Sequence, residues 1–276
     1  PVHAGTLARP DGLTHGDLQV QDGTLMSWHM RGVDGDTSKV RFYFDRFDVS
    51  SPASPQASPS VNVPGQVIAY DADAQRVVAV GFDLETVALT GDACWLHPQQ
   101  WGWDYDGGES CTIAHRPLHL LSLAGESASL LDTLDVEGED GRLSNVVSSG
   151  GRVFALVSEG SWYGGAVDEA GGGGGAVELP TDQLAIITGQ SGDELEQAAR
   201  VTLSEGGSWS WMAGAAGANA LFVSDRGLGF VDATVATAPR VTVVPTYGWG
   251  CYQPRVAGEV VYCPMDEYGL QAVAIP

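Results

Sequence analysis

The chain has 276 residues, of which 43% are hydrophobic and only 17% are charged, and its formal net charge is −22. This length can bury a sizeable core as one repeat-built domain, and 37 glycines and 14 prolines predict many turns and few long charged helices. With 35 acidic against 13 basic residues, the chain lacks the clustered cations that nucleic acid or an anionic lipid surface would require of a partner.

Membrane insertion is also not expected, because no run approaches the roughly 20 apolar residues of a spanning helix. No secretory signal pattern is present, and the chain begins at Pro1, from which we expect a processed or partial form of a longer protein. The acidic composition has two interpretations: solubility of a surface-exposed protein, or binding of divalent cations.

One pattern recurs along the chain: a polar or glycine turn, a short alternating strand, and a second strand. Five degenerate copies predict an all-β chain, and radial repetition of such units predicts a β-propeller with about five four-stranded blades. The predicted units of this single domain span approximately 16–65, 66–140, 141–205, 206–247 and 248–276, with an additional N-terminal strand at 2–8.

The strand signal is repeated from the first unit to the last. Val40–Val49 alternates best, with Phe42 and Phe44 on one face and Tyr43 and Asp45 on the other. Further strands are predicted at Leu25–Met30, Val61–Val63, Val67–Tyr70, Val77–Phe82, Leu143–Val147, Val153–Val157, Leu184–Thr188, Trp209–Met212, Ala220–Ser224, Leu228–Val231, Val260–Cys263 and Leu270–Ile275.

The ends of the chain leave two possibilities for the ring. The fifth unit stops at Ile275 and Pro276, before a fourth strand. Either residues 2–8 complete the last blade and the ring closes, or this chain is part of a larger propeller. The best helix pattern, Asp193–Arg200 with Ser191 as its cap, is about two turns long, and an acidic turn between strands is the alternative.

The four cysteines form two local pairs, Cys94 with Cys111 and Cys251 with Cys263. An even count with local spacing predicts two disulfides and an oxidising, extracellular or cell-surface location. Each disulfide would contribute roughly 3 kcal/mol in the chain-entropy model. A zinc site made of all four cysteines is the competing interpretation, but the spacings lack Cys-x-x-Cys.

The segment between Cys94 and Cys111 contains the candidate binding residues. Its large aromatic side chains cover a small core of the loop itself, contact a protein partner, or stack on a sugar ring. Its carboxylates have a spacing that could serve calcium, the one cofactor considered, or they form an acidic solvated loop. The aromatic candidates are Trp95, Trp101, Trp103 and Tyr105, and the calcium candidates are Asp104, Asp106 and Glu109.

Signatures of catalysis are weak. The chain has no Gly-x-Ser-x-Gly, and the glycine run 171–175 is not followed by Lys and Ser or Thr, as a nucleotide loop would be. His115 and His119 are four residues apart, but Pro117 between them blocks a helix that would align them. The other histidines, including His29, are scattered. We therefore expect no enzyme and no catalytic residues.

A resemblance supports the repeat interpretation. The stretch VRFYFDRFDVSSPASP followed by VNVPG, within Val40–Gly65, resembles the blade pattern of secreted bacterial β-propeller-domain proteins, a myxobacterial type distantly related to WD-repeat propellers. The resemblance covers most of the chain, strongly at Val40–Gly65 and weakly elsewhere. It implies secretion and a propeller, in a family whose members are longer, and it supplies no catalytic motif.

These observations favour a secreted, non-enzymatic propeller that acts as a structural or protein-interaction module of a bacterial cell surface or extracellular assembly. Its expected partner is another protein, the remainder of the same precursor, or a second copy. One alternative is a carbohydrate-binding module that uses Trp95–Tyr105. The other is a propeller-based enzyme with its site in the central channel, because fold alone cannot decide function.

Overall fold

In the computed structural model, every element of two or more residues in the described part of the chain is a β-strand. No helix among the residues it describes is long and apolar enough to cross a membrane. The structure describes residues 14–16, 18–21, 24–51, 53–89, 94, 97, 99, 110–138, 141–159, 181–204, 210–246, 251, 253–265 and 269–275.

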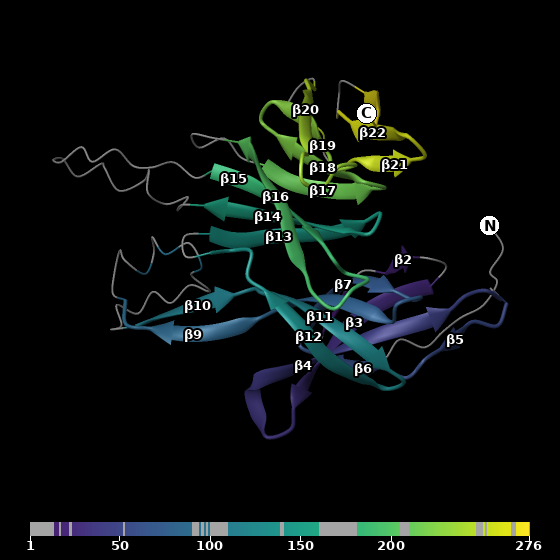
Figure 1. Ribbon diagram of the computed structural model, residues 1–276, viewed down its shortest axis with the longest axis vertical. Coiled ribbons are helices and arrows are strands. Elements are labelled where there is room, and N and C mark those ends of the chain that lie inside the picture. Colours follow the sequence, from purple (N-terminus) through teal and green to yellow (C-terminus); the bar gives the residue numbers. More distant parts are fainter. Residues whose placement is uncertain are drawn as a thin grey trace. The chain divides into compact units, whose positions relative to one another are not determined.

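The chain divides into two compact units, and each is described by itself. Unit 1 comprises residues 1–82, 117–134 and 189–195, and unit 2 comprises 83–116, 135–188 and 196–276. All the strand pairs are antiparallel and can be followed in Figure 1.

Unit 1 contains two sheets. In sheet I, β1, β3, β4 and β5 lie in that order, with β2 also paired to β3 and β6 to β4. In sheet II the order is β12-β11-β8-β7. The strands are β1 (Thr14–His15), β2 (Gln19–Gln21), β3 (Thr24–Val33), β4 (Asp36–Asp48), β5 (Gln56–Ala57), β6 (Val61–Val63), β7 (Gly65–Asp71), β8 (Arg76–Gly81), β11 (Leu118–Ala124) and β12 (Ser127–Leu134).

The core of unit 1 lies between these two sheets. The predicted alternation of β4 is confirmed, because Phe42 and Phe44 are buried there against Tyr70 and other apolar residues of sheet II. The guanidinium of Arg46 lies over the rings of Phe44 and Tyr70, 5.8 and 5.9 Å from their centroids. The even-numbered residues Phe42 and Phe44 of β4 therefore face the core, whereas Tyr43 and Asp45 lie on the opposite face of the sheet.

Unit 2 contains a two-stranded ribbon and three sheets. The ribbon pairs β9 (Asp83–Val87) with β10 (Cys111–His115). Sheets III, IV and V each follow chain order, as β13-β14-β15-β16, β17-β18-β19-β20 and β21-β22-β23. Their strands are β13 (Gly141–Ser149), β14 (Arg152–Glu159), β15 (Thr181–Thr188), β16 (Glu196–Ser204), β17 (Ser210–Ala216), β18 (Asn219–Ser224), β19 (Gly227–Asp232), β20 (Arg240–Val244), β21 (Arg255–Ala257), β22 (Val260–Pro264) and β23 (Leu270–Ala274).

Sheet IV is buried on both faces. Phe222 packs toward sheet III with Phe154 and Ile186, whereas Phe230 packs toward sheet V with Val261. Gly229 lies opposite Phe222 in the register, and an added Cβ there would lie 2.1 Å from the end of the Phe222 ring. The glycine therefore makes room for the Phe222 ring.

Two sequence expectations need correction. The helix candidate Asp193–Arg200 is wrong, because β16 begins at Glu196 and residues 189–195 form a turn that precedes it. The prediction of about five four-stranded blades also needs correction: over the described residues three sheets have four strands, and the other three have six, three and two. The other strand predictions within the described residues, such as Val61–Val63, coincide with or fall within observed strands, apart from end residues. The predicted N-terminal strand at 2–8 lies outside the described residues.

Candidate functional site

The predicted aromatic and calcium residues lie outside the described part of the chain. The structure describes instead the base from which their segment extends. The residues concerned are Trp95, Trp101, Trp103, Tyr105, Asp104, Asp106 and Glu109.

The base is a disulfide at one end of the β9–β10 ribbon. Cys94 and Cys111 are bonded, as the sequence predicted, with their Cα atoms 5.7 Å apart. Cys111 pairs with Val87 in the ribbon register, and both cysteines pack with Ile113 and Leu89 in a small buried cluster. The segment between these cysteines, which are 17 positions apart in the sequence, is therefore closed at its root by a covalent bond and an apolar contact.

Gln99 provides a second anchor inside the bracket. It is buried, its carbonyl accepts a hydrogen bond from the Ala114 amide at 2.8 Å, and its side-chain amide donates to the Gly138 carbonyl at 3.3 Å. The His97 amide donates to the Cys94 carbonyl at 3.1 Å. These bonds fix the backbone of the segment at Gln99 as well as at the cysteines.

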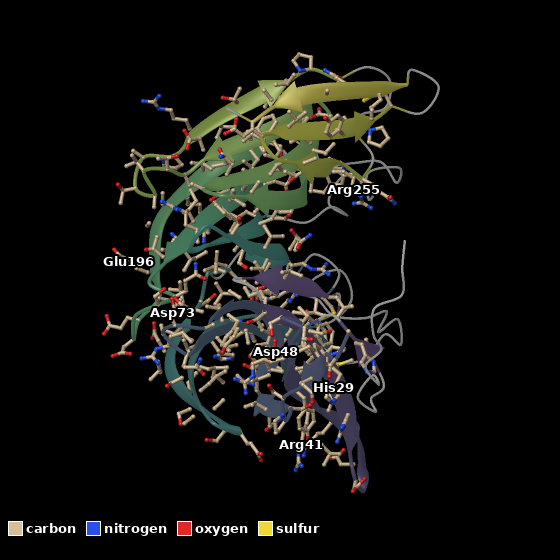
Figure 2. All side chains as sticks on the ribbon, turned by 90° about the vertical axis from the view of Figure 1, so that its right-hand side faces the viewer. His29, Arg41, Asp48, Asp73, Glu196 and Arg255 are labelled. Carbon is tan, nitrogen blue, oxygen red and sulfur yellow. A yellow bond between two sulfur atoms is a disulfide. The ribbon has the colours of Figure 1, made fainter. Side chains whose placement is uncertain are left out.

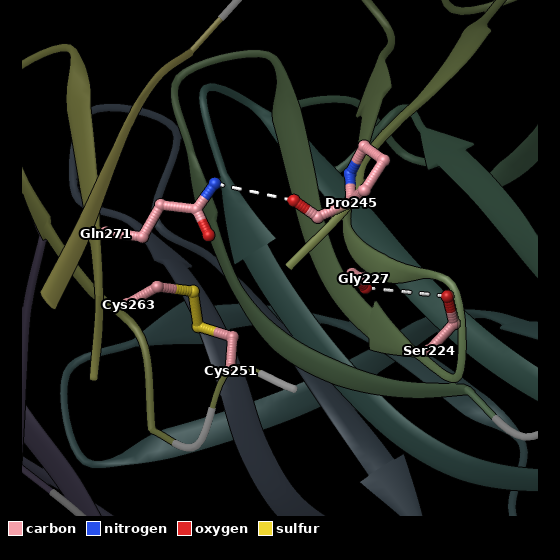
Figure 3. The surroundings of a disulfide bond; sticks show 6 residues. All are labelled: Ser224, Gly227, Pro245, Cys251, Cys263 and Gln271. Atoms are coloured by element: carbon pink, nitrogen blue, oxygen red, sulfur yellow. Dashed lines mark hydrogen bonds between the residues drawn. A yellow bond between two sulfur atoms is a disulfide. The ribbon is translucent and has the colours of Figure 1, made fainter. Parts of the chain in front are cut away.

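The second predicted disulfide is confirmed between Cys251 and Cys263, whose Cα atoms are 5.1 Å apart. Figure 3 shows this bond beside Gln271, whose amide donates to the Pro245 carbonyl at 3.4 Å. Both sulfurs belong to the buried cluster between sheets IV and V. Because all four cysteines are oxidised, they leave no thiolate for the zinc site considered from the sequence.

A buried polar cluster lies on the face of sheet I that points away from its core. His29 is 0% exposed, and its Nδ1 lies 2.6 Å from Oδ2 of buried Asp45. The Ser60 hydroxyl donates to the other carboxylate oxygen at 2.6 Å. His29 Nε2 has no hydrogen-bond partner among the described residues.

Three rings are stacked across this cluster. The His29 ring lies between those of His15 and Tyr43, with centroids 5.7 and 5.0 Å away. The guanidinium carbon of Arg31 lies over the Tyr43 ring, 5.1 Å from its centroid. The three rings come from directly paired positions on β1, β3 and β4, which explains why histidines that look scattered in sequence meet here.

The cluster has the donor set of a catalytic Asp–His pair but not its accessibility. A substrate cannot reach a ring that is fully buried. The network is therefore best interpreted as structural: its hydrogen bonds hold β3, β4 and Ser60 together. Asp182 in sheet III is likewise a buried carboxylate that accepts hydrogen bonds from several segments. Its carboxylate accepts from Ser158 at 2.6 Å, from Ser204 at 3.0 Å and from the Ser210 amide at 2.7 Å.

A third buried carboxylate, that of Glu137, joins the end of the β9–β10 ribbon to the start of β13. Glu137 accepts from the amides of Arg116 at 2.9 Å and Leu143 at 2.7 Å. Burial lowers the pKa of the Arg116 guanidinium, an effect that the nearby Glu137 charge opposes. No group of three or more His, Cys, Asp or Glu residues in the described ranges could hold a metal ion.

Comparison with known proteins adds little to this geometry. No protein-family model matches the chain, and no curated protein matches its sequence. The structure is similar to that of an uncomplexed acylaminoacyl peptidase from Pyrococcus horikoshii, with 7% identity and a TM-score of 0.45 over 90% of this chain and 35% of the peptidase. This chain thus spans about a third of the length of that peptidase. A likeness at this level supports no inference about fold or activity.

Proposed function

We propose that this chain is a β-propeller that serves as a secreted, non-enzymatic interaction module of a bacterial cell surface or extracellular assembly. Three consecutive antiparallel sheets in chain order, with sheet IV buried on both faces, are the packing expected of neighbouring blades. The blade-like sequence at Val40–Gly65 agrees with this interpretation. The two disulfides suggest an oxidising, extracellular environment.

The observation that carries the interaction role is the anchored base of the segment between Cys94 and Cys111. The disulfide, the small apolar cluster and Gln99 restrain this base before any partner arrives, which lowers the entropy cost of binding. Within the bracket, the sequence places three tryptophans and a tyrosine, the residue types that most often dominate binding energies at interfaces. We propose that these aromatic residues contact a protein partner.

A paired-variant experiment tests this role. Immobilised wild type, Trp101→Ala/Trp103→Ala and Trp211→Ala would capture proteins from an extracellular fraction, and bound species would be quantified by mass spectrometry. Trp211 is the matched control, because it is an exposed tryptophan on β17, outside the bracket. We expect a species that wild type and Trp211→Ala retain and the double variant loses, with a change of about 2 kcal/mol or more in binding free energy.

Thermal melts of the same variants separate recognition from support. An unchanged melting temperature with lost capture supports the proposal. Earlier melting with normal capture shows that the tryptophans only pack the loop. If soluble polysaccharides quench the tryptophan fluorescence of wild type but not of the double variant, the carbohydrate-binding alternative takes its place.

A further inference from the structure

The two disulfides of the chain have very different surroundings. Cys94 is 6% exposed, and the other three cysteines are 1% exposed or less. A thiol reduces a disulfide only when its thiolate reaches one of the two sulfurs. Since both bonds are buried, the structure around each bond must open first. The two disulfides therefore differ in how much structure protects them from reduction.

The bond between Cys251 and Cys263 is enclosed by two sheets. Cys263 lies on β22, the central strand of sheet V, and Cys251 precedes β21, which begins at Arg255 (labelled in Figure 2). Both cysteines belong to the core between sheets IV and V, together with Phe230 of β19 and Val261 of β22. A reagent reaches these sulfurs only when sheet V separates from sheet IV, which disrupts that core.

The bond between Cys94 and Cys111 lies at the end of a ribbon that has two strands over the described residues. Strand β9 is exposed along its length apart from half-buried Val87. The cluster around the bond adds buried Ile113 and partly buried Leu89 to the two cysteines. A two-stranded ribbon is only marginally stable by itself, and segments with little buried apolar area open without global unfolding. The end of the ribbon can therefore open while sheets III, IV and V remain folded.

Reduction of this bond would remove the covalent restraint at the base of the segment between Cys94 and Cys111. The base would keep the hydrogen bonds of Gln99 and the pairing of β9 with β10. A crosslink that is lost returns conformational entropy to the segment, and a partner must then order that segment at a higher cost in free energy. The state of the bond therefore sets the affinity of the proposed interaction segment.

We propose that the Cys94–Cys111 disulfide is a redox switch for partner binding, whereas the Cys251–Cys263 disulfide is a structural bond. This inference rests on the proposed function of the segment. The reductant is a dithiol: one of its thiolates attacks a cysteine sulfur, the S–S bond breaks, and the other cysteine leaves as a thiolate. The second thiol of the reagent then resolves the mixed disulfide. Two electrons and two protons pass from the dithiol, which becomes a disulfide, to the two cysteines, which become thiols.

Selective reduction of the whole oxidised chain tests the first half of the proposal. The native protein would be treated with dithiothreitol, alkylated at intervals with iodoacetamide, and mapped by peptide mass spectrometry. We expect Cys94 and Cys111 to be alkylated at least about tenfold faster than Cys251 and Cys263, because only the ribbon end must open. Before alkylation, the intermediate should be two hydrogens heavier than the oxidised chain, and a circular dichroism melt should show that it is still folded.

Capture of extracellular proteins tests the second half. The isolated, unalkylated intermediate should retain at least about tenfold less of the species whose capture depends on Trp101 and Trp103. Reoxidation with oxidised glutathione should restore both the original mass and the capture. The matched variant is Cys94→Ala/Cys111→Ala, which should capture as weakly as the intermediate and should not respond to either reagent.

Three results would overturn the proposal. One is reduction of both disulfides at the same rate, and another is earlier reduction of Cys251–Cys263. The third is a selectively reduced chain that captures the tryptophan-dependent species as well as the oxidised chain does. Failure of the proposed function gives a different result, which is visible before any reduction: the oxidised chain retains no species that Trp101→Ala/Trp103→Ala loses. The switch, which rests on that function, then falls with it.

Discussion

Arg76 on β8 forms an ion pair with Asp193, a residue 117 positions later in the sequence, and Nη2 of the arginine lies 2.7 Å from Oδ1 of the aspartate. The same guanidinium donates to the Gly192 carbonyl at 2.9 Å and to the Ser122 hydroxyl at 3.1 Å. One side chain thus joins three separate stretches of unit 1.

Replacing Arg76 by Met should destabilise the protein by about 1 to 2 kcal/mol, because several hydrogen bonds to a charged donor disappear together. Asp193→Asn is the informative comparison. Its carboxylate is mostly exposed, so that change should cost less than about 1 kcal/mol. Urea denaturation measures both. Equal losses in the two variants would show that the ion pair, rather than the bonds to Gly192 and Ser122, dominates.

Asp71 should make the stability depend on pH in acid. The Ala74 amide and then the Ser191 hydroxyl hold the pKa of Asp71 below its usual value. A carboxyl whose folded pKa is lowered stabilises the protein above its unfolded pKa, about 3.9, and this contribution is lost as pH falls through the folded pKa. Asp71→Asn should therefore melt earlier than wild type at neutral pH, with the difference shrinking below about pH 4. A pH-independent difference in melting temperature would contradict this.

Asp45→Ala should cost about 2 to 4 kcal/mol, because it leaves His29 and the Ser60 hydroxyl without their acceptor in a buried site. Ser60→Ala should cost about 1 kcal/mol, the value of one hydrogen bond. Guanidinium unfolding of the two single variants and the double variant gives the coupling energy. Independent, additive losses would show that the three side chains do not act as one network.

Reduction should raise the intact mass by four hydrogens, two for each disulfide. Cys251→Ala/Cys263→Ala should destabilise more than Cys94→Ala/Cys111→Ala, although its loop is shorter, 12 against 17 residues. The reason is that Cys251 and Cys263 belong to a larger buried core between two sheets, whereas Cys94 and Cys111 belong to a small cluster, so that loss of the former pair leaves the larger cavity in addition to the roughly 3 kcal/mol expected for each loop. Thermal melts rank the two. The reverse order would mean that the Cys94–Cys111 segment matters more to the fold than its small cluster suggests.

The strands were predictable where burial alternates strictly. Val61–Val63 matches β6, and the two faces of β4 follow directly from period-two alternation. The disulfides were also predictable, since nearby cysteines in an even set have few other partners. β16 was not: Glu196–Arg200 carries charged and small residues that suit a helix surface as well as an outer strand, and only its register with β15 decides.

The polar cluster around His29 and Asp45 could not be predicted from the sequence, for a different reason. His15 and His29 meet because β1 pairs with β3 in one particular register, and β1 is only two residues long. Likewise, nothing local indicates that Ser60 donates to Asp45, because the two residues are 15 positions apart and a Pro- and Ser-rich stretch lies between them. Contacts of this kind depend on register rather than on composition.

Unit 1 is built from three segments that are far apart in the sequence, so its last segment is synthesised well after its first. Its turn at residues 189–195 is made long after β8, and at about 5 to 20 residues per second the ribosome needs about 6 to 23 seconds to pass from Arg76 to Asp193. Throughout that interval Arg76 lacks its contact with Asp193, and Asp71 lacks its contact with Ser191. Unit 1 therefore cannot reach its final state on emerging from the ribosome. Three of the four strands of sheet III in unit 2, β13 to β15, are therefore translated before the last segment of unit 1.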